Sequence, residues 1–216
     1  MPLKCLTIIM LLLPLWGCNG IFGGIYDDMD GLDPTETKYG FTKPCTASEP
    51  GTIFLDSRDF VHWIYIDFSE GTAETLSIDD PAPDNWDIAL HHYDAKTNGG
   101  SAAKTTATTF QPILGGGAYT VGEYESDVWT NDRIAIDLSD MFNGNIIYQE
   151  SWCNMALSSW MSVDIKIMPP TYVHSGNVIS VRNADGTEVL LRLANYVNPK
   201  GAKGYLTLEY IYPTDR

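Results

Sequence analysis

The stretch 177-NVISVRNADGTEVLLRLANYVNPKGAKGYLTLEYIYP-213 decides the fold class. It contains three runs in which apolar and polar residues alternate, separated by Asn183–Gly186 and by residues 198–204. Alternation with a period of two is typical of a strand with one buried face, and Asn, Asp, Pro and Gly favour the turns between such strands. The stretch therefore predicts a three-stranded antiparallel meander.

Short β-favouring runs continue upstream to residue 52, separated by Gly, Pro, Asn and Asp. The clearest are TIFLDS, FVHWIYIDFS, NWDIALHHYDA, AKTTATTF and RIAIDLS. One segment, 154-NMALSSWM-161, predicts a helix, because Asn154 suits an N-cap and Ala156, Leu157 and Trp160 share one face. A chain of 216 residues with 44% hydrophobic residues suffices for one sizeable core. We therefore expect one mostly β domain, residues 52–216, with antiparallel strands and one short helix.

The first seventeen residues predict a lipoprotein signal peptide, because Lys4 precedes an apolar run of about a dozen residues. The sequence LWGC at 15–18 resembles the lipobox of bacterial lipoproteins, which makes Cys18 the predicted site of lipidation. Residues 18–51 are rich in Gly and Asp and predict an acidic tether. Acidic residues soon after this cysteine resemble the surface-export signal of Bacteroidetes lipoproteins, and a plain solvated linker is the alternative. No later apolar run approaches the ~18 residues of a transmembrane helix, so lipid alone is the predicted attachment.

The formal net charge is −15, which excludes nucleic acid as a partner because such a surface repels phosphate backbones. An anionic ligand would need local cations or strong non-ionic contacts. Cys45 and Cys153 lie in an exported context that permits a disulfide, and their spacing leaves a bridge open. The chain has no CxxC or HxxxH spacing, so no zinc site is indicated.

Five pieces occur in a fixed order: NWDIALHHYDAKTNGG, YTVGEY, MPPTY, VISVRNADG and YLTLEYIYP. In this combination the chain resembles the HmuY family of haem-binding lipoproteins from Bacteroidetes, over roughly residues 52–213. The resemblance implies a hand-shaped, almost all-β domain that grips one haem between finger-like loops. It also implies a haem carrier (hemophore), not an enzyme, held at the outer membrane by lipid, at the cell surface or released from it. Its implied partners are haem, host haemoproteins as a source, and a TonB-dependent outer-membrane haem receptor.

Some members of this family resemble the founding protein, which uses two axial histidines, and others use two methionines. Aligned through PPTY, the position of the second histidine falls near Ile165, and the stretch 161-MSVDIKIMPPTYV-173 contains no histidine before His174. Met168 stands in its place, immediately before two prolines that hold a loop extended. Met141 follows the strand RIAIDLS and precedes an Asn-Gly turn. The resemblance therefore implies Met141 and Met168 as the axial, metal-binding pair.

A thioether is a soft, neutral ligand that favours ferrous iron, so a methionine pair implies a preference for the ferrous form of haem (iron protoporphyrin). A mixed site, in which His174 replaces one methionine, is the main rival. His62 lies in a strand, where burial is expected. Met155 and Met161 are expected to be core residues of the short helix.

The pair His91 and His92 lies in a run that predicts a strand, where successive side chains point to opposite faces. One metal site using both imidazoles is therefore excluded unless a bulge intervenes. We expect one ring to be packed and the other exposed, with neither serving as a ligand.

A porphyrin needs apolar surroundings, and five residues next to the predicted ligands could supply them: Phe142, Ile147, Tyr148, Ile167 and Tyr172. The alternative function is a haem-free surface β lipoprotein that binds a glycan or a protein through partly exposed tryptophans: Trp63, Trp86, Trp129, Trp152 and Trp160. A carboxylate-based hydrolase would need a positioned pair of acids, and no motif organises Asp137, Asp140 and Asp164 into one.

Overall fold

The computed structural model describes residues 39–164 and 170–213. Strands dominate this part of the chain, and every strand pair in it is antiparallel. In chain order the strands are β1 (Gly40–Lys43), β2 (Gly51–Asp56), β3 (His62–Asp67), β4 (Thr72–Ser77), β5 (Ile88–His91), β6 (Asp94–Thr97), β7 (Ser101–Lys104), β8 (Glu125–Ser126), β9 (Val128–Asp137), β10 (Ile147–Cys153), β11 (Met161–Asp164), β12 (Thr171–His174), β13 (Val178–Arg182), β14 (Glu188–Val197) and β15 (Lys203–Ile211). The predicted class, a mostly antiparallel β protein, is confirmed.

The C-terminal meander forms as predicted and lies at the centre of the larger sheet. This sheet has the order β1-β2-β15-β14-β13-β7-β8. In the first turn of the meander the N–H of Asn183 donates to the carbonyl of Thr187 over 2.8 Å, and Gly186 adopts φ 88°. Glycine suits this position because it has no Cβ to clash when φ is positive.

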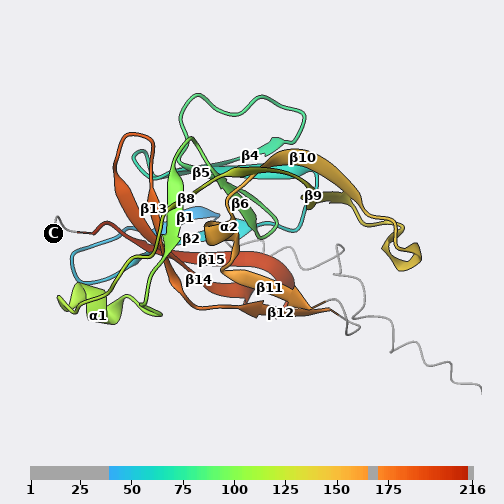
Figure 1. Ribbon diagram of the computed structural model, residues 1–216. Coiled ribbons are helices and arrows are strands. Elements are labelled where there is room, and N and C mark those ends of the chain that lie inside the picture. Colours follow the sequence, from blue (N-terminus) through green and yellow to red (C-terminus); the bar gives the residue numbers. More distant parts are fainter. Residues whose placement is uncertain (1–38, 165–169, 214–216) are drawn as a thin grey trace, which may run out of the picture.

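A smaller sheet, of order β4-β3-β5-β6, packs over the larger one (Figure 1). The main core contains residues from both sheets, among them Leu55 of β2, Ile66 of β3, Leu90 of β5 and Leu206 of β15. Strand alternation puts Ile64 and Ile66 of β3 into this core, while Trp63 and Tyr65 face the other way. On that outer face they pack against Ile134 of β9, so β3 and β5 are buried on both faces of the small sheet.

Two further strand pairs, β9 with β10 and β11 with β12, form separate two-stranded sheets. Figure 1 shows both as hairpins that project from the same side of the body formed by the two larger sheets. They are the feature of the fold that positions the candidate site.

The helical content differs from the prediction of one helix. The predicted helix exists as α2 (Met155–Ser158), and the side chain of Asn154 caps it by accepting a hydrogen bond from the N–H of Leu157 over 2.9 Å. A second helix, α1 (Gln111–Leu114), and a 3-10 turn, η1 (Met141–Asn143), were not predicted. Each is only one turn long, too short for a helical period to appear in the sequence.

The first strand changes the expected boundary of the domain. β1 lies within the range predicted as tether, 18–51, yet it pairs with β2 and places Phe41 against the main core. The β domain therefore includes residues from Gly40 onward. The predicted signal peptide, Cys18 and residues 19–38 of the predicted tether lie outside the described residues.

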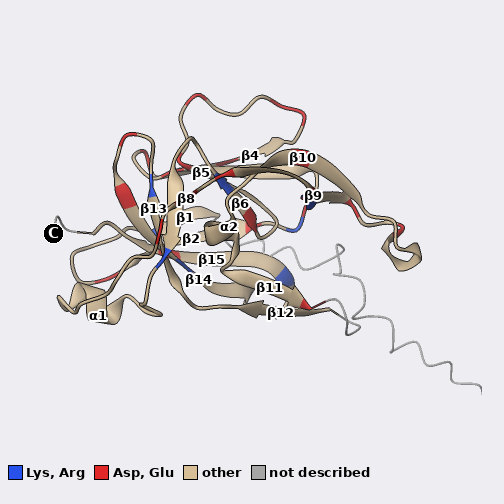
Figure 2. Ribbon diagram, in the orientation of Figure 1, with Lys and Arg blue, Asp and Glu red and all other residues tan. Residues whose placement is uncertain are grey.

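Three further features of the described residues are the distribution of acids, the state of the cysteines and the length of the helices. Figure 2 shows acidic residues spread over several loops and hairpins. Cys45 and Cys153 are both free thiols, so the disulfide left open by the sequence is not formed. Among the described residues, no helix has the length and apolar character needed to span a membrane.

Candidate functional site

The predicted ligand Met141 lies at the closed end of the β9–β10 hairpin. The turn there is compact, because the N–H of Met141 donates to the carbonyl of Leu138 over 3.1 Å and the N–H of Gly144 donates to the carbonyl of Met141 over 3.0 Å. The carboxylate of Asp140 accepts hydrogen bonds from the side-chain amides of Asn145 and Asn143, and these bonds lower its pKa. Met141 is thus presented by a hydrogen-bonded turn.

The side chains around Met141 are apolar and open to solvent. Phe142 is 59% exposed, Ile147 56% and Tyr148 38%, while Met141 itself is half-buried. Large apolar side chains gathered at one exposed end of a hairpin are typical of a surface that binds an apolar partner. Three of the five residues predicted to surround the haem, Phe142, Ile147 and Tyr148, are therefore exposed on the hairpin that carries Met141.

The second predicted ligand, Met168, lies outside the described residues, as does Ile167. The strands on either side of them are described, and Asp164 of β11 pairs with Thr171 of β12. His174, the predicted rival ligand, pairs with Met161 at the opposite end of the same hairpin. Three residues of antiparallel strand separate His174 from Thr171, a distance of about 10 Å.

Aromatic rings join the β11–β12 hairpin to the body of the protein. Tyr172 of β12 stacks on Tyr196 of β14 with ring centroids 5.1 Å apart, and Tyr93 meets Tyr172 edge-on at 6.3 Å. Burial raises the pKa of Tyr93, and Asp94, Tyr172 and Tyr148 act in the same direction. Since Tyr148 belongs to β10 and Tyr172 to β12, Tyr93 lies within electrostatic range of both hairpins. Lys203 lies over the ring of Tyr172 with its Nζ 5.1 Å from the centroid.

A buried ion pair fixes the base of the β9–β10 hairpin. Nη2 of Arg133 lies 2.5 Å from Oδ1 of Asp94, whose side chain is almost fully buried. Burial raises the pKa of the Asp94 carboxyl, and the guanidinium of Arg133 opposes that rise. This pair ties β9 to β6, so it holds one hairpin against the small sheet.

The two adjacent histidines are structural, and the expected exposure of one of them is wrong. His91 ends β5 and points Nε2 at the carbonyl of Phe60 over 2.9 Å. His92 lies in the turn with φ 55°, outside the strand, and Nδ1 faces the carbonyl of Ser57 at 2.7 Å. Both are buried. A carbonyl can only accept, so the proton lies on Nδ1 of His92, and Nε2 accepts from the hydroxyl of Tyr196 at 2.6 Å.

Other candidate residues divide into core and surface. Met161 is buried as expected, on β11 rather than in the helix, but Met155 is 36% exposed, so its expected place in the core is wrong. Nδ1 of His62 lies 2.9 Å from Oδ2 of Asp59 at the start of β3. Of the predicted tryptophans, Trp63 and Trp160 are buried, whereas Trp129 and Trp152 are more than half exposed. Within the described ranges, no group of three or more His, Cys, Asp or Glu side chains could hold a metal ion.

Sequence reasoning did not find Tyr93 or the pair Asp94 and Arg133. The two charged residues are 39 positions apart, and nothing in their local patterns indicates that β6 and β9 meet. It also missed a cavity of about 400 Å³ between Trp86 and Trp152, at the base of the β9–β10 hairpin. Met141 does not line this cavity.

Comparison with known proteins gives one family. A family model described as HmuY protein matches residues 59–210. A solved structure from Bacteroides vulgatus, described as an HmuY-like heme binding protein, is 42% identical and superposes with a TM-score of 0.76 over 83% of this chain and 100% of that one. A structure from Bacteroides fragilis, described as a lipoprotein, is 36% identical, with a TM-score of 0.76 over 82% of this chain and 97% of that one.

More distant structures share the fold. The apo HmuY analog of Tannerella forsythia is 22% identical, with a TM-score of 0.64 over 77% of this chain and 96% of that one. No curated protein gives a significant match.

Proposed function

The chain belongs to the HmuY family, and from this premise we propose that it is an exported lipoprotein that binds haem through the two axial methionines Met141 and Met168. The family resemblance drawn from the sequence is thereby confirmed. The description of the Bacteroides vulgatus relative supports haem as the ligand, and that of the Bacteroides fragilis relative supports acylation at Cys18.

The observation that carries this proposal is the exposed apolar end of the β9–β10 hairpin around Met141. A porphyrin offers two large apolar faces, and their burial at about 25 cal/mol per Å² is the main source of affinity. Phe142, Ile147 and Tyr148 supply such a surface beside a sulfur ligand. The β11–β12 hairpin, which leads to Met168, projects on the same side of the molecule (Figure 1) and would supply the opposite wall.

The carboxylates of haem need compensation on a protein with a net charge of −15. Lys203, beside Tyr172, is a cation at the base of the β11–β12 hairpin that could meet a propionate. Bound iron would accept the two thioether sulfurs as axial ligands, and soft neutral sulfur favours the ferrous state. The chain supplies the ligands and the apolar walls, and it contributes no catalytic group. The proposed role is to take haem from host haemoproteins and pass it to a TonB-dependent outer-membrane receptor.

A haem titration tests the ligand set. Haem is added to the chain lacking residues 1–18, with and without dithionite, and the visible spectrum is recorded. Thioether ligation predicts a Soret shift that is much stronger after reduction. A ferric complex as strong as the ferrous one would indicate that histidine, not methionine, binds the iron. Absence of any shift would reject haem binding and leave the haem-free surface lipoprotein.

A further inference from the structure

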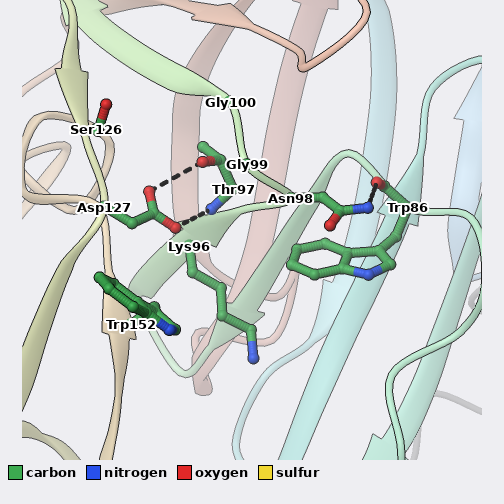
Figure 3. A pocket seen from close by; sticks show the side chains of 9 residues that line it. All are labelled: Trp86, Lys96, Thr97, Asn98, Gly99, Gly100, Ser126, Asp127 and Trp152. Atoms are coloured by element: carbon green, nitrogen blue, oxygen red, sulfur yellow. Dashed lines mark hydrogen bonds between the residues drawn. The ribbon is translucent and has the colours of Figure 1, made fainter.

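The cavity at the base of the β9–β10 hairpin has two indole walls, Trp86 and Trp152, with Lys96 between them (Figure 3). The indole of Trp86 packs edge-on against the ring of Tyr65 with centroids 5.2 Å apart, and the indole of Trp152 packs edge-on against Trp129 with centroids 5.5 Å apart. The volume of about 400 Å³ suits a small molecule of one or two rings.

Lys96 lies on β6 and passes over the outer face of the small sheet. Its Nζ lies 3.9 Å from the ring centroid of Trp63, 5.5 Å from that of Tyr65 and 5.7 Å from that of Trp86. Within the described part of the chain, this ammonium makes no salt bridge and no hydrogen bond. Its N–H groups therefore have ring faces as neighbours but no oxygen acceptor from the protein.

The carboxylate of Asp127, whose charge acts on this ammonium, already accepts hydrogen bonds from other groups. Oδ2 of Asp127 accepts the N–H of Thr97 over 2.8 Å, while Oδ1 accepts the hydroxyl of Thr97 over 2.9 Å and the side chain of Asn154 over 3.0 Å. Asp127 thus ties β6 to the start of β9 and does not neutralise Lys96. Burial lowers the pKa of Lys96 to about 8, and Asp127 only partly opposes this effect. A ligand oxygen at Nζ would stabilise the charged form.

We propose that this cavity is a second ligand site, which binds a planar aromatic carboxylate with its ring between Trp86 and Trp152 and its carboxylate on Nζ of Lys96. The indole walls offer stacking or edge contacts to a ring, and the ammonium offers the charge-assisted hydrogen bond that a carboxylate requires. Lys96 combines a position against three aromatic rings with the lack of an acid partner, in a chain with 28 acidic and 13 basic residues. It gives an anion a local point of attachment on a surface that otherwise repels it.

This site is separate from the proposed haem site. Trp152 is five residues along β10 from Ile147, which places it about 17 Å from the end of the hairpin that presents Met141. The proposal therefore stands or falls independently of haem binding, and occupancy by haem need not exclude the second ligand.

Isothermal titration of the mature chain with 2-naphthoate and its uncharged counterpart 2-naphthamide tests the proposal. We expect the carboxylate to bind at least about tenfold more tightly than the amide, the effect of one charge-assisted hydrogen bond. Lys96→Gln should abolish this preference, Lys96→Arg should restore much of it, and Trp152→Ala should weaken both compounds. Lys104→Gln, which changes an exposed lysine on β7, is the matched control.

Two outcomes overturn the site, namely no binding of 2-naphthoate at millimolar concentration, or binding that Lys96→Gln leaves unchanged. Circular dichroism and the haem spectrum of each variant check that the fold is intact. Should Lys96→Gln fail to fold, Lys96→Arg and Trp152→Ala decide, because Trp152 is 52% exposed and its truncation spares the core. Met141→Ala should leave the binding of 2-naphthoate unchanged.

Discussion

The hydroxyl group of Tyr196 donates a hydrogen bond to Nε2 of His92 across 2.6 Å and so joins β14 of the large sheet to the β5–β6 turn of the small one. The other ring nitrogen of His92 donates to Ser57, and the carbonyl of His92 accepts from the hydroxyl of Ser57. Every polar group of this imidazole has a partner, which explains how a residue with φ 55° is retained in a two-residue hairpin turn. Burial of the ring favours its neutral form.

Acid should therefore weaken the fold through His92. Burial lowers the pKa of this imidazole from 6.5 to about 4, so the unfolded chain binds a proton in that window and the folded chain does not. The free energy of unfolding should fall as the pH drops from 6.5 toward 4, by about 3 kcal/mol from this group. Urea titrations across this range measure the effect. His92→Gln should flatten the profile, whereas His62→Gln, at an accessible histidine, should not.

Met141→Ala should weaken the complex with ferrous haem by more than about tenfold, because loss of an axial ligand exceeds the effect of removing an outer partner. Met168→Ala should do the same. Met155→Ala is the matched control, because Met155 is an accessible methionine that lies on α2, away from the proposed site. It should leave the spectrum of the reduced complex unaltered. If Met141→Ala and Met168→Ala gave the same reduced spectrum as Met155→Ala, the methionine pair would not be the ligands.

His174→Ala should leave ferrous haem affinity unchanged, because His174 lies at the end of the β11–β12 hairpin away from the segment that contains Met168. Titration of the reduced protein measures this directly. Loss of the complex in His174→Ala would instead establish the mixed methionine and histidine site.

Arg133→Met should destabilise the protein by about 3 kcal/mol, because it leaves the carboxylate of Asp94 buried without its partner. Chemical denaturation gives the value. Lys43→Met breaks the exposed ion pair with Glu49 and should cost far less stability than Arg133→Met. The double variant Arg133→Met, Asp94→Asn should recover part of the lost stability, and its failure to do so would argue against charge burial as the cause.

Alkaline pH should stabilise the wild-type chain relative to Lys96→Met. The pKa of Lys96 is lowered from 10.5 to about 8 in the folded state, so between these values the unfolded chain binds more protons. The difference in unfolding free energy between wild type and variant should therefore shift in favour of the wild type as the pH rises from 8 to 10.5. Comparing the two proteins at each pH cancels the contribution of tyrosines common to both.

The C-terminal meander and α2 could be predicted because their signals are local. Alternation, the turn residues of Asn183–Gly186 and the N-cap Asn154 each act within a few positions. The pairing of β2 with β15 and the packing of β9 over Trp63 depend on residues far apart in the chain, and no local pattern specifies such contacts. The sequence predicts a strand through His92, but the structure has a turn there with φ 55°. The hydrogen bonds that hold this turn join His92 to Ser57 and Tyr196, which are far away in the sequence.

For the candidate site, the family resemblance implies Met141, and the Asn-Gly turn that follows it is a local feature typical of a hairpin end. The sequence does not show that Lys96 is a partly buried cation. Alternation places its side chain on one face of β6, but this face lines a cavity only because the β9–β10 hairpin lies over it. A site formed where two separate segments meet leaves no signal in either segment alone.

The two edges of the large sheet are formed by short strands, β1 with four residues and β8 with two, and the pairing of β1 is irregular between Phe41 and Lys43. Such interrupted edges give a neighbouring molecule few backbone groups to add to. On a membrane, where the proposed lipid anchor would bring copies of the chain together, these short edges would oppose edge-to-edge pairing of their sheets while leaving the projecting hairpins free.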